Sequence, residues 1–138
     1  LEPGEHQIRV KVWDVFNNSS ESEITFTVMP NDNLVINNFN NYPNPFSSST
    51  AFYFQHNQVG QQLDFILNIY SITGVLIKSL DISSFISNGY RVGPIVWDGT
   101  NSYGAKVNPG VYIANLTVSD KNNNKFTTKS TRAIILPY

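Results

Sequence analysis

The sequence predicts an all-β protein, and three observations support this fold class. Apolar and polar residues alternate along every long apolar stretch, which is the period of a half-buried strand. Clusters of Asn, Ser, Gly and Pro separate these stretches and are typical of turns. No window carries the apolar spacing of an amphipathic helix. After about residue 38 the pattern gives about seven strands, as expected for an immunoglobulin-like β-sandwich.

The composition excludes several classes of function. Charged residues make up 14% of the 138 residues and the formal net charge is −1, so the chain has no basic stripe for a nucleic-acid backbone. It has no cysteine, which excludes disulfides, thiolate catalysis and cysteine-bound zinc. No apolar run approaches the roughly 18 residues of a membrane helix. We therefore expect no nucleic-acid partner, no cofactor and no direct insertion into a membrane.

Residues 1–30 predict a β-hairpin that ends a preceding β-sandwich domain. Two alternating runs, 8–12 and 24–28, flank a turn rich in Asn and Ser. Because a lone hairpin is marginal in water, we expect these strands to belong to a second sandwich or to pack on the domain that follows. The turn-rich stretch 31–37 predicts a linker, and residues 38–138 form the main domain.

The strands of the main domain follow from the same alternation. They are expected over residues 51–56, 63–70, 75–80, 111–118 and 125–136. The second face of 63–70 is partly apolar as well, which predicts a central strand. Gly93-Pro94 separates two short extended pieces, 89–92 and 95–97, and predicts an edge strand or a bulge, since proline donates no ladder hydrogen bond. Residues 82–85 either extend the preceding strand or form a helical turn.

Candidate catalytic and metal-binding groups are few. His6 and His56 are the two histidines, and no Ser-His-Asp set accompanies them, so we expect a surface or hydrogen-bonded structural role for His56. Oxygen atoms for a calcium ion could come from Asp98, Thr100, Asn101 and the Gly104 carbonyl. Their spacing and charge do not match a calcium loop, and a turn held by Asx hydrogen bonds is the favoured interpretation.

The last strand has a mild positive bias and an apolar end. Lys125, Lys129 and Arg132 are either solvated positions on an edge or part of a recognition strand, because residues 134–138 form an apolar chain end. The residues alone leave these two interpretations about even. In the second, the partner-binding residues are Lys129, Arg132, Ile134, Ile135 and Leu136.

Four motifs in a fixed order resemble a known family. They are an NYPNPF start with Pro43, Asn44, Pro45 and Phe46, an IYSITG hairpin ending at Gly74, a WDG loop with Trp97, Asp98, Gly99 and Gly104, and a GVY strand with Gly110 and Tyr112. Each motif alone is weak, but the ordered set is specific. With the basic, apolar last strand it resembles the type A C-terminal sorting domain of the type IX secretion system, which has an FlgD-like immunoglobulin fold.

Residues 1–28 narrow the resemblance, because they are similar to the segment upstream of the sorting domain in the PorU-type sortase, a gingipain-like cysteine peptidase. The resemblance implies a non-catalytic secretion and docking domain that is exported to the cell surface at the outer membrane. Its partners would be an outer-membrane β-barrel shuttle of the PorV type and the secretion machinery. The full protein would cleave the sorting domains of cargo, with its catalytic residues upstream.

Two departures from the family pattern concern the hairpin and the chain end. Val75 stands where the family usually has arginine, and the chain ends in Leu136-Pro137-Tyr138, where many cargo domains end in lysine or arginine. One alternative is therefore the cleavable sorting domain of an ordinary type IX cargo protein. Another is a carbohydrate-binding β-sandwich, because seven Tyr and two Trp could stack on sugars.

Overall fold

The structure, a computed structural model, describes residues 4–28 and 33–137. Within these ranges the chain forms nine β-strands and no helix, and so no helix that could cross a membrane. The strands lie in two compact units, Leu1–Asp32 and Asn33–Tyr138. The predicted all-β class is confirmed.

The first unit is a hairpin of β1 (Gly4–Trp13) and β2 (Ser19–Val28), paired antiparallel without a register shift. Asp14 closes its turn, because Oδ1 accepts hydrogen bonds from the N–H groups of Phe16 and Asn18, each at 2.9 Å. The apolar side chains of Ile8 and Ile24 face each other across the two strands and are more than half exposed. The predicted hairpin is confirmed; its membership of a second sandwich stays a prediction.

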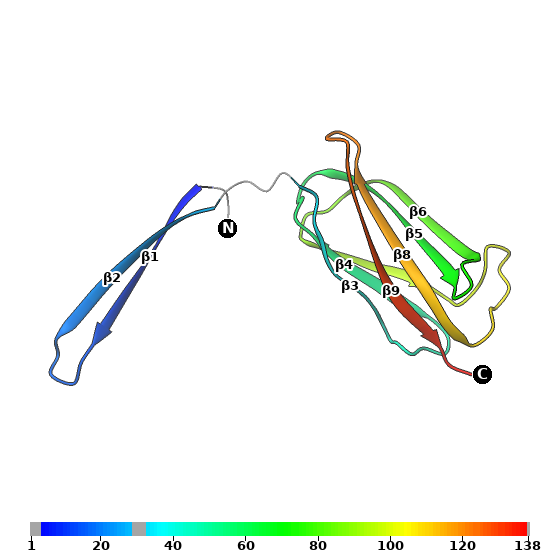
Figure 1. Cartoon of the computed structure of the whole chain (residues 1–138), viewed down its shortest axis with the longest axis horizontal. Helices are drawn as coiled ribbons and strands as arrows, with labels where there is room; N and C mark the ends of the chain where they lie inside the picture. The colour runs from blue at the N-terminus through cyan, green and yellow to red at the C-terminus, as the bar shows by residue number, and fades with distance from the viewer. Residues whose placement is uncertain (1–3, 29–32, 138) are drawn as a thin grey trace. The chain divides into compact units, whose positions relative to one another are not determined.

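The second unit is a sandwich of seven antiparallel strands in two sheets. Figure 1 shows how its labelled strands are arranged. One sheet has the order β3-β4-β7, with bounds Ile36–Tyr42, Thr50–His56 and Arg91–Trp97. The other has the order β6-β5-β8-β9, with bounds Leu76–Ile86, Gln62–Ser71, Gly110–Asp120 and Lys125–Ile135. The strand count and the inner position of β5 agree with the sequence prediction.

The core lies between the two sheets and is built from alternate positions of their strands. The inward side chains of β5 and β8 are buried, and they are Leu63, Phe65, Leu67, Ile69, Tyr112, Ala114, Leu116 and Val118. Phe54 of β4 meets Phe65 edge to face, with ring centroids 5.5 Å apart, and joins the two layers. Apolar burial of this kind is the main stabilising contribution in a sandwich.

One boundary prediction needs correction, and one of the two alternatives for residues 82–85 is confirmed. The linker predicted over 31–37 is too long, because Leu34 and Ile36 are buried in the sandwich core and β3 begins at Ile36. Residues 31 and 32 lie outside the described ranges. The ambiguous stretch 82–85 belongs to β6, where Ser84 takes a positive φ of 58° and forms part of a bulge that the periodicity does not reveal.

Candidate partner-binding strand

The C-terminal half of β9 is fixed by the loop that follows β3. The loop bends at residues 43–45. Asn41 and Thr50 hold its base, since the Asn41 amide donates to Thr50 Oγ1 at 3.0 Å and that hydroxyl donates to the Pro43 carbonyl at 2.8 Å. Asn44 then reaches β9, where its Nδ2 donates to the Arg132 carbonyl at 2.8 Å. The loop thus ends beside the last strand.

Phe46 continues this contact as a short parallel bridge to Ile135. Its N–H donates to the Ile134 carbonyl at 2.9 Å, and its carbonyl accepts the N–H of Leu136 at 2.8 Å. The Phe46 ring is buried and meets Trp97 edge to face at 5.5 Å. Phe46, through this isolated bridge, therefore covers one end of the outer edge of β9.

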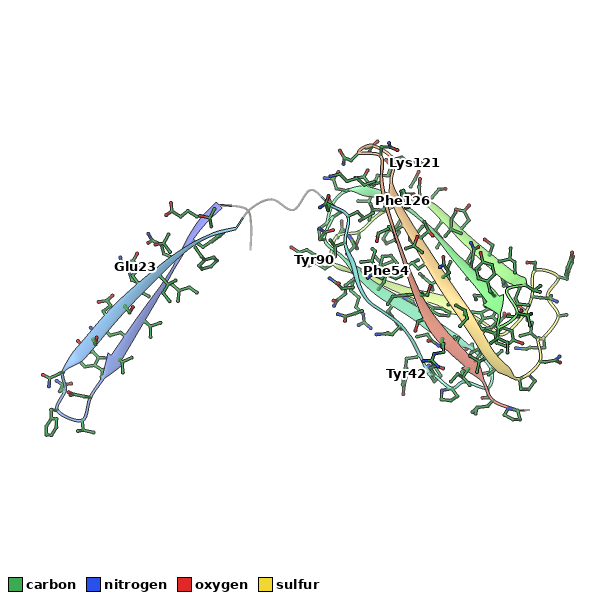
Figure 2. All side chains as sticks on the ribbon, in the orientation of Figure 1. Glu23, Tyr42, Phe54, Tyr90, Lys121 and Phe126 are labelled. Carbon is green, nitrogen blue, oxygen red and sulfur yellow. The ribbon has the colours of Figure 1, made fainter. Side chains whose placement is uncertain are left out.

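No described residue makes hydrogen bonds of this kind to Phe126, Thr128 or Ser130 in the N-terminal half of β9. In an antiparallel strand the N–H and C=O groups of one residue point to the same side of the strand. The backbone groups of residues 132, 134 and 136 bond to the loop that contains Asn44 and Phe46. The backbone groups of even-numbered residues in β9 therefore point away from β8. By this alternation the backbone groups of Phe126, Thr128 and Ser130 face outward. All three residues are exposed, and Phe126 lies at the start of β9 beside the β8–β9 turn (Figure 2).

The predicted partner-binding residues divide into surface and core positions. Lys129, Arg132 and Leu136 are exposed, and Ile134 is half-buried. Ile135 is 2% exposed, so this member of the predicted partner-binding set lies in the core and not on the surface. The physical reason is alternation, because Ile135 shares the inward face of β9 with buried Ala133.

A shallow hollow accompanies Arg132 on the outer side of β8 and β9. It has a volume of about 390 Å³, and its lining residues are Ile113, Ser130, Thr131 and Arg132. Arg132 is one of the partner-binding residues that the sequence predicts, whereas Phe126, Thr128 and Ser130 are not. The pattern of an edge strand could have suggested them, but only the contact with Asn44 shows which half of the edge is open.

The loop from Trp97 to Tyr112 is a structural corner. Trp97 Nε1 donates to the Thr100 carbonyl at 2.9 Å, and the Trp97 and Tyr112 rings meet edge to face at 5.5 Å. Gly99, at a φ of +71°, lies against Phe46 and Ile135, with about 3.6 Å from its missing Cβ position to either side chain. The WDG signature therefore supports the same end of β9 as the proline loop. Glycine at 74, 104 and 110 also takes a positive φ.

The ammonium group of Lys78 lies beside the oxygen atoms of Asp98 and Thr100, which a calcium ion would need as ligands. Lys78 Nζ lies 3.7 Å from Asp98 Oδ1 and donates to Thr100 Oγ1 at 3.0 Å. The Thr100 hydroxyl bonds Asp98 and lowers the pKa of that carboxyl. Asn101 Oδ1 accepts the N–H groups of Tyr103 and Ala105, each at 3.0 Å. The predicted Asx-bonded turn is confirmed.

The described residues offer no cluster of side chains that could bind a metal ion. No group of three or more His, Asp or Glu side chains within the described ranges is close enough to hold a metal ion. His56 is 4% exposed, and its Nδ1 accepts the N–H of Gln58 at 3.1 Å, so it is a buried structural residue and not a surface one. Burial lowers its pKa.

Aromatic residues that could stack on a sugar are partly engaged inside the fold. Trp97 and Tyr112 are buried in the core. The Arg91 guanidinium lies over the Tyr53 ring at 4.4 Å from its centroid, and the ring packs against Gly93 on the same surface. These three aromatic side chains, Tyr53, Trp97 and Tyr112, are therefore not available to stack on a sugar, which argues against the carbohydrate-binding alternative.

One solved structure supports the resemblance that the motifs predict. A crystal structure of dimeric latent PorU from Porphyromonas gingivalis is similar to this chain, with a TM-score of 0.68 and 29% sequence identity. The match covers 100% of this chain and 13% of the PorU chain. No protein-family model matches the sequence. No curated protein matches it either. The resemblance to the C-terminal region of a PorU-type protein is confirmed.

Proposed function

We propose that this chain is the non-catalytic secretion and docking domain of a type IX secretion sortase. The observation that carries the proposal is the likeness to PorU over the whole chain, hairpin included. The ordered motifs of the sandwich support a relation to the type IX secretion system. The similarity of the hairpin to the segment upstream of the sorting domain supports a PorU-type protein in particular. The similarity to PorU supports a domain related to that system, exported and associated with the cell surface.

The docking partner in this proposal is an outer-membrane β-barrel shuttle of the PorV type, and the docking element is β9. Lys129 and Arg132 supply exposed positive charge, and Leu136, which follows the strand, supplies exposed apolar area. The structural corner and the proline loop hold the end of this strand in place. The catalytic groups of the whole protein, a gingipain-like cysteine peptidase, lie outside these residues.

A binding measurement tests the docking role. The full-length protein and the detergent-solubilised shuttle barrel of the same bacterium are mixed, and the dissociation constant is measured by biolayer interferometry. Changing Lys129→Ala together with Arg132→Ala should weaken binding at least about tenfold, since charge pairs at a binding edge each contribute on the order of 1 kcal/mol. Lys11→Ala in the hairpin is the control. Equal binding by the double variant would refute the role of β9.

Mass spectrometry of the surface protein separates the sortase from ordinary cargo. A sortase domain that docks on a barrel should remain attached to the exported protein, with peptides from β8 and β9 recovered at the cell surface. A cleaved sorting domain would leave the mature protein without these peptides. That result would favour the cargo alternative.

A further inference from the structure

The four edges of the sandwich differ in how they are protected against pairing with another strand. An edge strand presents unpaired N–H and C=O groups, and proteins usually interrupt it with a bulge, a proline or a charge. On β3 a bulge lies between Asn37 and Asn40, where Asn38 takes a φ of 52°. On β7 the bulge contains Gly93 and Pro94. Both edges of this sheet are therefore irregular.

The two edges of the larger sheet are unlike each other. β6 is irregular at two places, one of them at Ser84. β9 pairs with β8 from Asp120–Lys125 to Gly110–Ile135 without any register shift, and no proline interrupts it. Within residues 33–137, β9 is therefore the only edge strand of the sandwich whose pairing has no register shift.

This regular edge is closed in one half and open in the other. Asn44 and Phe46 bond its outward groups from Arg132 to Leu136. The outward N–H and C=O groups of Phe126, Thr128 and Ser130 have no hydrogen-bond partner within the described residues. An open edge of this length matches an extended segment that adds as a further strand.

The positive charge of β9 favours one kind of incoming segment. Lys125, Lys129 and Arg132 are the charged residues of β9, and the strand carries no Asp or Glu. Two copies of β9 side by side would place like charges opposite each other, which destabilises a strand pair. A segment with Asp or Glu would be attracted to the same positions.

We infer that the open half of β9 is a strand-addition site for an extended, acidic segment of the docking partner. This inference rests on the proposed function and specifies how the partner is bound. Main-chain hydrogen bonds to Phe126, Thr128 and Ser130 supply affinity, and Lys129 sets the preference for acidic residues. The exposed Phe126 ring covers apolar residues of the incoming segment.

Proline at position 128 tests the site, because the N–H that it removes faces away from β8. The full-length protein is titrated with the solubilised shuttle barrel. Thr128→Pro should weaken binding at least about tenfold. Thr117→Val on β8 removes the hydroxyl contact with Thr128 and leaves every N–H of β9 in place, so it should bind within about twofold of the wild type. Circular dichroism and thermal melting check that both variants fold.

Amide hydrogen exchange on the wild-type protein provides a second measurement that needs no variant. Binding should slow exchange at Phe126, Thr128 and Ser130, while the Ile134 amide, already bonded to Asn44, should change little. Wild-type protein that does not bind the barrel would refute the proposed function itself. Binding with unchanged exchange at these three amides, or undiminished binding by Thr128→Pro, would overturn the strand-addition site alone.

Discussion

Asn44 and Ile134 are ninety positions apart in the chain and share a hydrogen bond, in which the Ile134 N–H donates to Asn44 Oδ1 at 3.0 Å. The amide nitrogen of the same side chain donates to the Arg132 carbonyl at 2.8 Å. One side chain thus satisfies both kinds of backbone group on the outward side of β9. It ties the first loop of the sandwich to its last strand.

Asn44→Ala should therefore destabilise the sandwich and free the end of β9. Losing these two hydrogen bonds at a partly exposed site should cost about 1–2 kcal/mol in the free energy of unfolding. Chemical denaturation measures the loss, and faster amide exchange at Ile134 locates it. Asn40→Ala, an exposed change in the neighbouring strand, is the control. Unchanged exchange at Ile134 would mean that Asn44 does not hold the strand.

Gly93→Ala should destabilise the protein through the bulge of β7. A Cβ at this position would lie 2.4 Å from Tyr53 Cδ1 and 2.7 Å from the Phe52 carbonyl oxygen, and φ is +140°. The backbone conformation alone costs on the order of 1–3 kcal/mol for a non-glycine residue, and the clash with a backbone atom adds to it. Gly89→Ala meets no atom within 4 Å and should change the melting temperature little. Equal melting of the two variants would contradict the crowding at Gly93.

Local patterns predicted the parts of the fold that depend on one strand and its neighbours. The alternation of Leu63, Phe65, Leu67 and Ile69 with less apolar residues predicted an inner strand, and these four side chains fill the core. Gly93-Pro94 predicted an edge or a bulge, and β7 has both. Such features follow from backbone geometry and the period of a strand.

Contacts between distant segments could not be predicted in the same way. An apolar chain end such as Ile134-Ile135-Leu136 has the same pattern whether it packs inside or meets a partner. Alternation turns Ile135 to the inward face of β9, and Phe46 and Gly99, neither of which is near it in sequence, cover it there. The open half of β9 could not be predicted either, because its limit is set by the contact of the strand with Asn44, which is distant in sequence.

Acidification should destabilise the sandwich through His56. Burial lowers the pKa of His56 below its ordinary value of 6.5, so the unfolded chain binds a proton more readily than the folded one. Stability from this residue is complete above pH 6.5 and falls as the pH drops below it, by at most about 1.4 kcal/mol per pH unit. Urea denaturation between pH 7.5 and 5.5 should show this slope, and His56→Gln should lose it. His6→Gln is the control. An identical slope in His56→Gln would assign the effect to another group.

Lys129→Val should convert the open edge of β9 into a site of self-association. Lys129 lies opposite Leu116 on the inward side of the strand, where a charge discourages two edges from pairing. Valine at this position leaves the edge regular, removes the charge and raises the strand propensity. Light scattering with size-exclusion chromatography should detect dimers of the full-length variant at a concentration roughly tenfold lower than for the wild type. Thr131→Val, on the same face of the same strand, keeps Lys129 and should behave as the wild type. If Lys129→Val stays monomeric to the same concentration as the wild type, Lys129 does not protect this edge.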